Sequence, residues 1–244
     1  MKILGIIPAR YASSRFPGKP LVDIGGKTMI QRVYEQCTKP ASLSKVIVAT
    51  DDMRIFDEVI RFGGEVMMTS TEHLNGTSRC AEVLKHFTET ALEPVDFVIN
   101  IQGDEPLINP KQIDELAKLF EDESAQIVTQ AKEETDVALL ENPNIVKAIF
   151  DENGFAVDFK RNLQLTTYNS QLFYKHIGIY GFKTEVLQEI TYLTPTQNEL
   201  EHKLEQLRWL DNNYKIKIGI TEHESISIDI AEDLEKVRKI LKDL

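Results

Sequence analysis

The chain has 244 residues, enough for one large or two small domains that bury a core without disulfide bonds. Apolar residues make up 42% and charged residues 27%, an ordinary globular composition that excludes a disordered or fibrous chain. The net charge of −11 argues against binding to nucleic acid, two cysteines exclude a disulfide scaffold, and no apolar run is long enough to span a membrane. We therefore expect a cytoplasmic protein with no nucleic-acid or membrane partner.

In the first half of the chain, short β-branched runs alternate with amphipathic segments. We expect strands at residues 3–7, 45–50, 65–69 and 95–101, and helices at residues 28–39, 53–62, 77–91 and 110–121. Gly63 and Gly64 end the second helix, and Pro110 opens the fourth. Because parallel strands need helical crossovers, this order predicts an α/β fold with a Rossmann-like, mostly parallel sheet flanked by helices.

The pattern changes after about residue 125. We expect further strands at residues 125–130, 145–150, 155–159, 174–182 and 215–220, and helices at residues 184–193, 198–210 and 231–244. The turn signal at residues 151–154 joins two of these strands into a hairpin. With no repeat and no obvious linker, we interpret residues 1–244 as a single domain that carries an antiparallel insertion around residues 145–182.

The segment after the first strand, residues 8–20, is the most informative part of the sequence. It carries Arg10, Arg15 and Lys19 and no acidic residue, within an otherwise acidic chain. Ligands of open α/β sheets lie beyond the carboxyl ends of the strands, where guanidinium, ammonium and backbone N–H groups can hold a polyphosphate. On charge alone, a solvated surface loop is an equally open alternative. The spacing of a P-loop and that of a dinucleotide site are both absent from this segment.

A carboxylate follows another buried strand. Asp104 comes shortly after Ile101, at the carboxyl end of the strand predicted at residues 95–101. Near a cationic phosphate loop this aspartate makes sense as a ligand of Mg²⁺, which favours carboxylate and phosphate oxygens. A turn or helix-cap role for Asp104 stays open.

These segments resemble those of a known enzyme family. The residues Ile7-Pro-Ala-Arg10 and Ser14-Arg-Phe-Pro-Gly-Lys-Pro20 resemble the nucleotide-binding signature of the 3-deoxy-manno-octulosonate (Kdo) cytidylyltransferases, also called CMP-Kdo synthetases. Further matches follow in the family's order at Ala49-Thr-Asp-Asp52, Asn75-Gly-Thr-Ser-Arg79, Asn100-Ile-Gln-Gly-Asp-Glu-Pro106, His176-Ile-Gly-Ile-Tyr-Gly181, Leu204-Glu-Gln-Leu-Arg208 and Asp229-Ile-Ala-Glu-Asp-Leu234. Several ordered motifs over nearly the whole chain are more specific than any one of them.

The resemblance implies a fold of the nucleotide-diphospho-sugar transferase type, a homodimer formed through the antiparallel insertion, and the reaction of CTP with Kdo to give CMP-Kdo and diphosphate for lipopolysaccharide synthesis. The catalytic residues that it implies are Arg10, Arg15, Lys19, Asp104 and Asp229, with Mg²⁺ bound by Asp104 and Asp229. The nucleotide-binding residues that it implies are Pro8, Ala9, Arg10, Ser14, Lys19, Asn75, Gly76, Thr77 and Gln102. The sugar-binding residues that it implies are Arg79, Gln102, Arg161, His176, Tyr180, Glu205 and Gln206.

Bland alternatives to some of these roles stay open. Asp229 precedes a predicted helix, follows a short β-like run at residues 225–228, and could be a helix N-cap. His176 could be a packed core histidine. Glu205 and Gln206 could lie on the solvated face of an amphipathic helix.

One region departs from the family pattern. Where members usually carry a tyrosine-phenylalanine-serine-arginine run, this chain has Asp158-Phe-Lys-Arg161, and Ser78 replaces an acidic residue. The new charges are compatible with a modified acid sugar, such as 8-amino-Kdo, or with a shortened dimer-contact loop. A nucleotide-binding protein without turnover is a further alternative. The joint presence of Arg10, Lys19, Asp104 and Asp229 argues against it.

Overall fold

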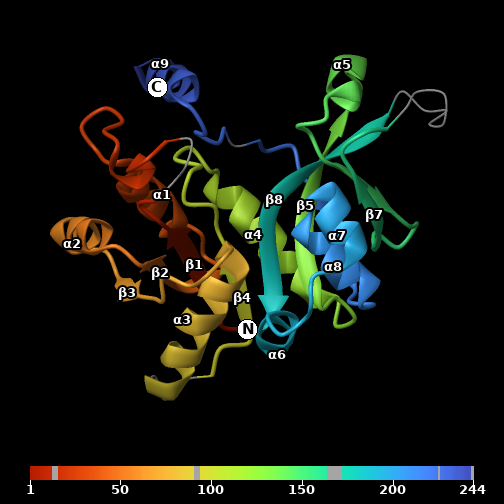
Figure 1. Ribbon diagram of the computed structural model, residues 1–244, viewed down its shortest axis with the longest axis horizontal. Helices are drawn as coiled ribbons and strands as arrows, with labels where there is room; N and C mark the ends of the chain where they lie inside the picture. The colour runs from red at the N-terminus through yellow and green to blue at the C-terminus, as the bar shows by residue number, and fades with distance from the viewer. Residues whose placement is uncertain (13–15, 91–93, 164–171, 225, 243–244) are drawn as a thin grey trace. The chain divides into compact units, whose positions relative to one another are not determined.

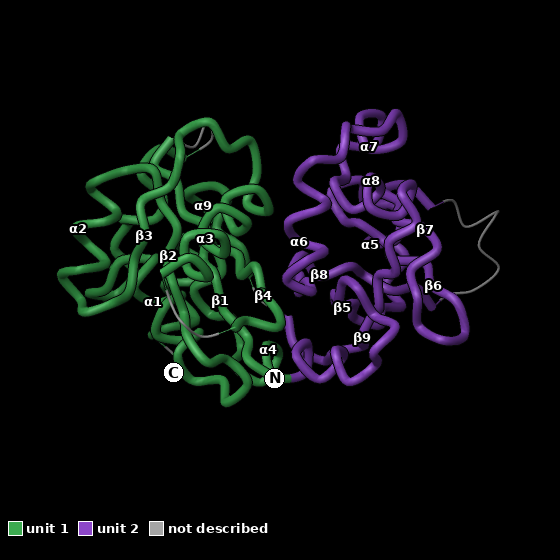
Figure 2. Tube along the Cα trace, turned by 90° about the horizontal axis from the view of Figure 1, so that it is seen from below, with its two compact units in different colours: residues 1–114, 225–244 green, residues 115–224 purple. Residues whose placement is uncertain are grey.

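The computed structural model is shown in Figure 1. It describes residues 1–12, 16–90, 94–163, 172–224 and 226–242. The chain divides into two compact units, which are coloured separately in Figure 2. Unit 1 comprises Met1–Asp114 and Ser225–Leu244, and unit 2 comprises Glu115–Glu224. The interpretation of residues 1–244 as a single domain stays a prediction. Among the described residues, no helix has the length and apolar character needed to cross a membrane.

Unit 1 is built on a parallel sheet in which the described strands run in the order β3-β2-β1-β4 (Figure 1). These strands are β1 (Ile3–Ala9), β2 (Leu43–Thr50), β3 (Val66–Met68) and β4 (Phe97–Asn100). The central strand β1 pairs in parallel with both β2 and β4 and is buried along nearly its whole length. A parallel strand covered on both faces is expected to be apolar throughout, as this one is. The predicted parallel sheet is thus confirmed.

The helices of unit 1 form at the predicted amphipathic segments. They are α1 (Met29–Cys37), α2 (Met53–Arg61), α3 (Gly76–Thr90) and α9 (Ala231–Lys242), and the boundary between the units falls within α4 (Pro110–Lys118). The side chain of Thr28 caps α1 by accepting a hydrogen bond from the N–H of Gln31. Asp52 caps α2 in the same way. Gly63, in the left-handed region at φ 79°, follows the end of α2.

The chain returns to unit 1 along residues 226–230, which form neither helix nor strand, so the predicted β-like run is wrong there. Ile228 is 1% exposed and anchors this segment in an apolar cluster. The other buried members of that cluster are Ile24, Met29, Leu234 and Val237. The backbone N–H of Ile228 donates to the carbonyl of Asp104 at 2.9 Å. The segment before α9 is therefore fixed to the loop after β4.

Unit 2 contains a mixed sheet. Its described strands are β5 (Ile127–Glu134), β6 (Lys147–Phe150), β7 (Ala156–Lys160), β8 (Phe173–Lys183) and β9 (Ile216–Ile220). β5 pairs antiparallel with β8 and parallel with β9, while β6 pairs antiparallel with both β7 and β8. The hairpin predicted between β6 and β7 is confirmed, with Gly154 at φ 77° in its turn. The dimerisation role of residues 145–182 stays a prediction.

The helices of unit 2 are shorter than those of unit 1. They are α5 (Val137–Glu141), α6 (Thr184–Ile190), α7 (Gln197–His202) and α8 (Glu205–Asp211). The single helix predicted at residues 198–210 is wrong, because Lys203 takes left-handed angles, φ 53° and ψ 48°, and ends α7. The Arg161 guanidinium donates to the carbonyls of His202 at 3.1 Å and of Lys203 at 3.4 Å, and so holds this break.

Candidate active site

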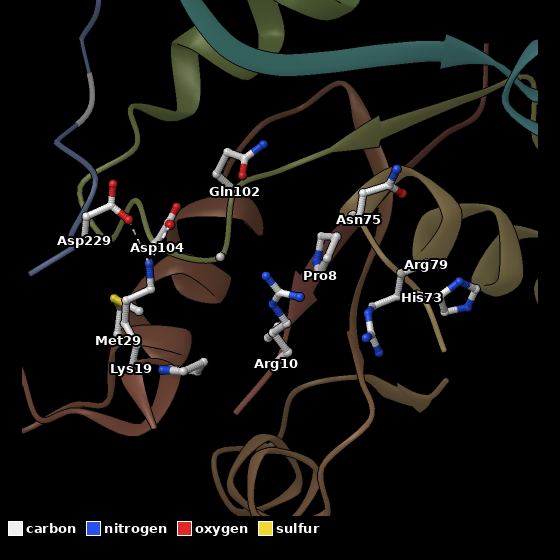
Figure 3. Close-up of a pocket in the computed structure, with 14 residues that line it drawn as sticks. Pro8, Arg10, Lys19, Met29, His73, Asn75, Arg79, Gln102, Asp104 and Asp229 are labelled. Carbon is white, nitrogen blue, oxygen red and sulfur yellow. Dashed lines mark hydrogen bonds and ion pairs between the residues drawn. The ribbon is translucent and has the colours of Figure 1, made fainter. Parts of the chain in front are cut away.

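A pocket of about 250 Å³ lies in unit 1 beyond the carboxyl ends of β1 and β4 (Figure 3). Residues predicted as site residues supply most of its lining: Pro8, Ala9, Arg10, Lys19, Asn75, Gly76, Arg79, Gln102, Asp104 and Asp229. Pro20, Met29, His73 and Gly103 also line it and were not predicted. The structure therefore gathers five separate sequence segments at one place.

The pairing of β1 with β4 brings two of these segments together. Ile6 pairs with Asn100, so that the loops that follow the two strands leave the sheet side by side. A Cβ atom added at Gly103 would lie only 2.7 Å from the carbonyl oxygen of Pro8. Only glycine allows so close an approach, which explains why the loop after β4 carries a glycine before Asp104.

Lys19 lies between the two predicted metal ligands (Figure 3). Its Nζ is 2.7 Å from Oδ2 of Asp104 and 3.5 Å from Oδ1 of Asp229, and its side chain is 13% exposed. Lys19 opens a 3₁₀ turn, Lys19–Leu21, which follows Gly18 at φ 72°. Two carboxylates and one ammonium group thus lie in contact, although their residues are far apart in the sequence.

The carboxylate of Asp233 holds the backbone at Asp229. It accepts hydrogen bonds from the N–H of Asp229 at 3.2 Å and of Ile230 at 3.3 Å, at the start of α9. Burial acts to raise the pKa of Asp233, but these bonds and Lys236 outweigh it and lower the pKa. Asp233 therefore accepts hydrogen bonds at this helix start, and the carboxylate of Asp229 lies toward Lys19 (Figure 3).

The two aspartates fit a divalent cation. Among the described residues there is no cluster of three or more histidine, cysteine, aspartate or glutamate side chains that could hold a metal. Mg²⁺ does not need one, because it is usually bound by one or two carboxylates together with substrate phosphates. The ammonium of Lys19, in contact with both Asp104 and Asp229, already shows that these carboxylates can share a positive charge.

The segment before and within α3 supplies the opposite side of the pocket. Asn75 accepts a hydrogen bond from the N–H of Ser78 at 2.9 Å and so caps α3. Arg79 is 3% exposed, and its guanidinium pairs with Asp51 at 2.8 Å. The charge of Arg79 is therefore balanced within unit 1. Thr77 is buried and does not line the pocket.

His73 is a pocket residue that sequence reasoning missed. Its Nε2 bonds to the carboxylate of Glu82 on α3, which also accepts the N–H of Ser70 at 2.9 Å. Burial acts to raise the pKa of Glu82, but the bonds from Ser70 and His73 outweigh it and lower the pKa. His73 thereby ties the loop before Asn75 to α3. The available signal was its place two residues before the matched motif that begins at Asn75.

The first loop contains two further basic residues, Arg10 and Arg15. Arg10 is exposed, lines the pocket, and has no ion-pair partner among the described residues. Ser14 and Arg15 lie outside the described residues, so their roles stay predictions.

The other predicted sugar-binding residues lie in unit 2. The rings of His176 and Tyr180 are 5.4 Å apart, and Tyr180 meets Trp209 of α8 edge-on at 5.0 Å. Burial lowers the pKa of His176 to about 3, so this imidazole is neutral. Burial, and then the nearby charge of Glu205, raise the pKa of Tyr180. A hydrogen bond with Thr129 acts in the opposite direction. The structure thus brings His176 and Tyr180 together near the start of α8.

Two alternatives change in the light of these contacts. Gln206 is 6% exposed, so a solvated helix face is wrong for this residue. On β7, Lys160 pairs with Asp158 at 3.1 Å, so the two charges that depart from the family pattern balance each other. The guanidinium of Arg161 is occupied with backbone carbonyls at the end of α7.

Comparison with known proteins gives concordant matches. The family model for cytidylyltransferases matches residues 4–218. A 3-deoxy-manno-octulosonate cytidylyltransferase of Parabacteroides distasonis is 48% identical over 99% of this chain and 98% of its own length. Its counterpart in Bacteroides thetaiotaomicron is 47% identical over 100% and 99%. A solved structure of a CMP-2-keto-3-deoxy-manno-octonic acid synthetase complexed with CTP is 35% identical, has a TM-score of 0.92, and is matched over 100% of this chain and 99% of that chain.

Proposed function

The chain belongs to the cytidylyltransferase family, among its 3-deoxy-manno-octulosonate members, and from this premise we propose that it catalyses the reaction of CTP with Kdo to give CMP-Kdo and diphosphate. It is therefore a nucleotidyltransferase that activates an acid sugar for transfer, here as a precursor of lipopolysaccharide. The observation that carries the proposal is the pocket of unit 1, where Lys19 lies between Asp104 and Asp229.

The reaction brings together two anions. The anomeric hydroxyl of Kdo attacks the α-phosphorus of CTP, a new P–O bond forms, diphosphate leaves with the electrons of the broken P–O bond, and the hydroxyl proton is lost to solvent. The protein has little covalent work to do, so positioning and neutralisation of charge supply most of the acceleration. A pocket that holds cations at one end of the sheet of unit 1 suits both demands.

In this proposal the first loop and the neighbouring pocket residues bind the triphosphate of CTP. Arg10 has no ion-pair partner in the part of the chain that the structure describes, and Lys19 places its ammonium in the same pocket, so each can take phosphate oxygens. Pro8, Ala9, Asn75, Gly76 and Gln102 line the same pocket and bind the rest of the nucleotide. In this proposal Ser14 and Arg15 extend the phosphate contacts, and Thr77 acts from within α3.

Cytidylyltransferases in general use a divalent metal, and here we propose Mg²⁺. Asp104 and Asp229 would hold it, because their carboxylates already converge on one cation. When bound, the ion supplies positive charge against the phosphates and makes the attacking hydroxyl more acidic. Lys19 then gives up its carboxylate contacts and turns to a phosphate oxygen.

In this proposal the sugar is bound by the residues that the family resemblance implies. Kdo has many hydroxyl groups, which Tyr180, Glu205 and Gln206 can distinguish as donors and acceptors. The neutral imidazole of His176 contributes a hydrogen bond and no charge. The remaining sugar-binding residues of the proposal are Arg79, Gln102 and Arg161. The enzyme acts as a homodimer joined through residues 145–182, in the cytoplasm, where CTP is made.

The proposal is tested by measuring diphosphate release with components left out in turn. Release should require CTP, Mg²⁺ and Kdo together, and CMP-Kdo should appear in equal amount. Parallel reactions with 8-amino-Kdo identify a modified sugar as the true substrate if its kcat/KM is the higher. No release with either sugar would contradict the enzymatic function and leave nucleotide binding without turnover.

A further inference from the structure

The hydroxyl of Thr129 lies beside two of the predicted sugar-binding residues of unit 2, His176 and Tyr180. Thr129 is 0% exposed on β5, and its Oγ1 contacts three polar atoms of β8 besides the Tyr180 hydroxyl. Nε2 of His176 is at 3.0 Å, the carbonyl oxygen of Ile179 at 2.8 Å and that of Ile177 at 3.2 Å. Nothing in the sequence motifs marks Thr129, and neither the resemblance nor the proposed function uses it.

These three contacts determine where the protons lie. A carbonyl oxygen can only accept, and a threonine hydroxyl has a single proton to donate. The short contact with Ile179 claims that proton, because two oxygens at 2.8 Å without a proton between them would repel each other. The contact with His176 must then run the other way, from Nε2–H to Oγ1 of Thr129. A neutral imidazole that carries its proton on Nε2 has a lone pair on Nδ1.

The backbone of β8 is shaped around the same hydroxyl. Thr129 pairs with Tyr180 while the next residue, Gln130, pairs with Ile177, so β8 has two additional residues at this point. Four residues of regular strand would span about 13 Å, whereas the rings of His176 and Tyr180 are 5.4 Å apart. Irregularities of this kind re-aim side chains beside functional sites. The Thr129 hydroxyl satisfies carbonyls that the bulge removes from the regular pairing.

We infer that Thr129 is a positioning residue, whose hydroxyl accepts the Nε2 proton of His176 and thereby makes Nδ1 the atom that accepts a hydrogen bond from a hydroxyl of the acid sugar. The inference rests on the proposed function, which makes the sugar the ligand of His176. Among the described residues, none forms a hydrogen bond with Nδ1. The uncharged state of this imidazole, whose pKa desolvation lowers to about 3, is consistent with a fixed tautomer.

The tautomer can be read directly by NMR. In protein labelled with nitrogen-15 at its five histidines, the two ring nitrogens of a neutral imidazole have separate resonances, and the spectrum of His176→Gln identifies those of His176. The free wild-type protein should carry the proton on Nε2. Thr129→Val should shift the population toward Nδ1–H, and Thr129→Ser, which keeps the hydroxyl, should restore the wild-type spectrum. Thr221→Val is a matched control, because Thr221 is also buried but donates to Glu115.

Kinetics then connects the tautomer with the sugar. Thr129→Val should raise KM for Kdo about fivefold, the effect of one lost neutral hydrogen bond, and leave KM for CTP unchanged. Thr129→Ser should restore KM for Kdo. A wild-type spectrum with the proton on Nδ1, or a Thr129→Val spectrum like that of the wild type, would overturn the inference. Absence of CMP-Kdo formation by the wild type would instead overturn the proposed function, so the two failures are distinguishable.

Discussion

At the scale of single residues, the pocket of unit 1 is organised by one ammonium group. Lys19 contacts Asp104 at 2.7 Å and Asp229 at 3.5 Å, with little exposure to solvent. It keeps two carboxylates together that would otherwise repel each other. In the proposed function, a divalent cation would have to displace Lys19 from the same oxygens, and the triphosphate would offer the ammonium new partners.

This competition makes a prediction for Lys19→Met. Without nucleotide, the variant should bind Mg²⁺ several-fold more tightly than the wild type, because its competitor for the carboxylates is gone. Its kcat/KM for CTP should fall at least about tenfold, because a phosphate contact is lost. Titration calorimetry measures the first quantity. Lys27→Met, which removes an exposed pair with Glu35, is the control, and unchanged or weaker Mg²⁺ binding by Lys19→Met would contradict the account.

The half-buried imidazole of His176 makes a prediction about pH. Its pKa is about 3 in the folded protein and about 6.5 when unfolded, so between these values the unfolded state binds more protons. The free energy of unfolding of the wild type should therefore fall on acidification through this range, by at most about 1.4 kcal/mol per pH unit from this group.

His176→Gln lacks that titration, so its stability relative to the wild type should improve as the pH falls. Urea unfolding at about pH 7 and about pH 5 measures the difference. His202→Gln, a change at an exposed histidine on α7, is measured in parallel as the control. A constant difference for His176→Gln would show that His176 titrates normally.

At the scale of elements, the start of α9 delivers Asp229 to the pocket. The Asp233 carboxylate bonds the N–H groups of Asp229 and Ile230, while Ile228 is buried and bonded to the carbonyl of Asp104. The side chain that aims Asp229 is therefore one helical turn away from it.

Asp233→Ala should weaken this arrangement. We expect a loss of about 1 kcal/mol in the free energy of unfolding, as for other helix caps, and a several-fold weaker Mg²⁺ affinity measured by calorimetry. Asp136→Ala removes the cap of α5 in unit 2 and should lower stability with no change in metal affinity. Equal Mg²⁺ affinities in Asp233→Ala and the wild type would show that Asp229 does not depend on its cap.

The elements themselves were largely predictable, for identifiable reasons. In unit 1, apolar β-branched runs alternate with amphipathic segments, so period and order together define a parallel sheet. The predictions fail where a single residue decides. Lys203 takes a left-handed conformation, which a lysine in the sequence does not predict. It divides one predicted helix into α7 and α8. The five residues of α5 are too few to show a helical period.

At the scale of the whole molecule, the site depends on contacts between distant parts of the sequence. In the sequence, Asp104 stood out because it follows a strand, and Asp229 because it precedes a helix. Only the family resemblance implied that the two share a metal ion. Their convergence comes from the return of residues 226–230 to unit 1, fixed by Ile228. Local patterns carry no information about such a contact. For the same reason Thr129 and His73, which act through partners on other segments, were missed.

The net charge of the molecule and the charge of its first loop have opposite signs. The chain carries 39 acidic and 28 basic side chains, yet its candidate site holds Arg10 and Lys19 on a loop without any acidic residue. A field that is negative overall would repel two anionic substrates, so local cations must dominate within the pocket. The carboxylates of Asp104 and Asp229 would also repel anionic substrates unless a bound cation neutralises them.

The central claim is that Asp104 and Asp229 hold one divalent ion, and a double-mutant cycle tests it most directly. Asp104→Asn and Asp229→Asn should each lower kcat/KM at least about a hundredfold while the fold stays cooperative, and Asp57→Asn, on the exposed side of α2, should not. Because both carboxylates serve one ion, the double variant should be scarcely slower than the slower single variant. Effects that multiply in the double variant, or a near-normal rate in either single variant, would contradict the account.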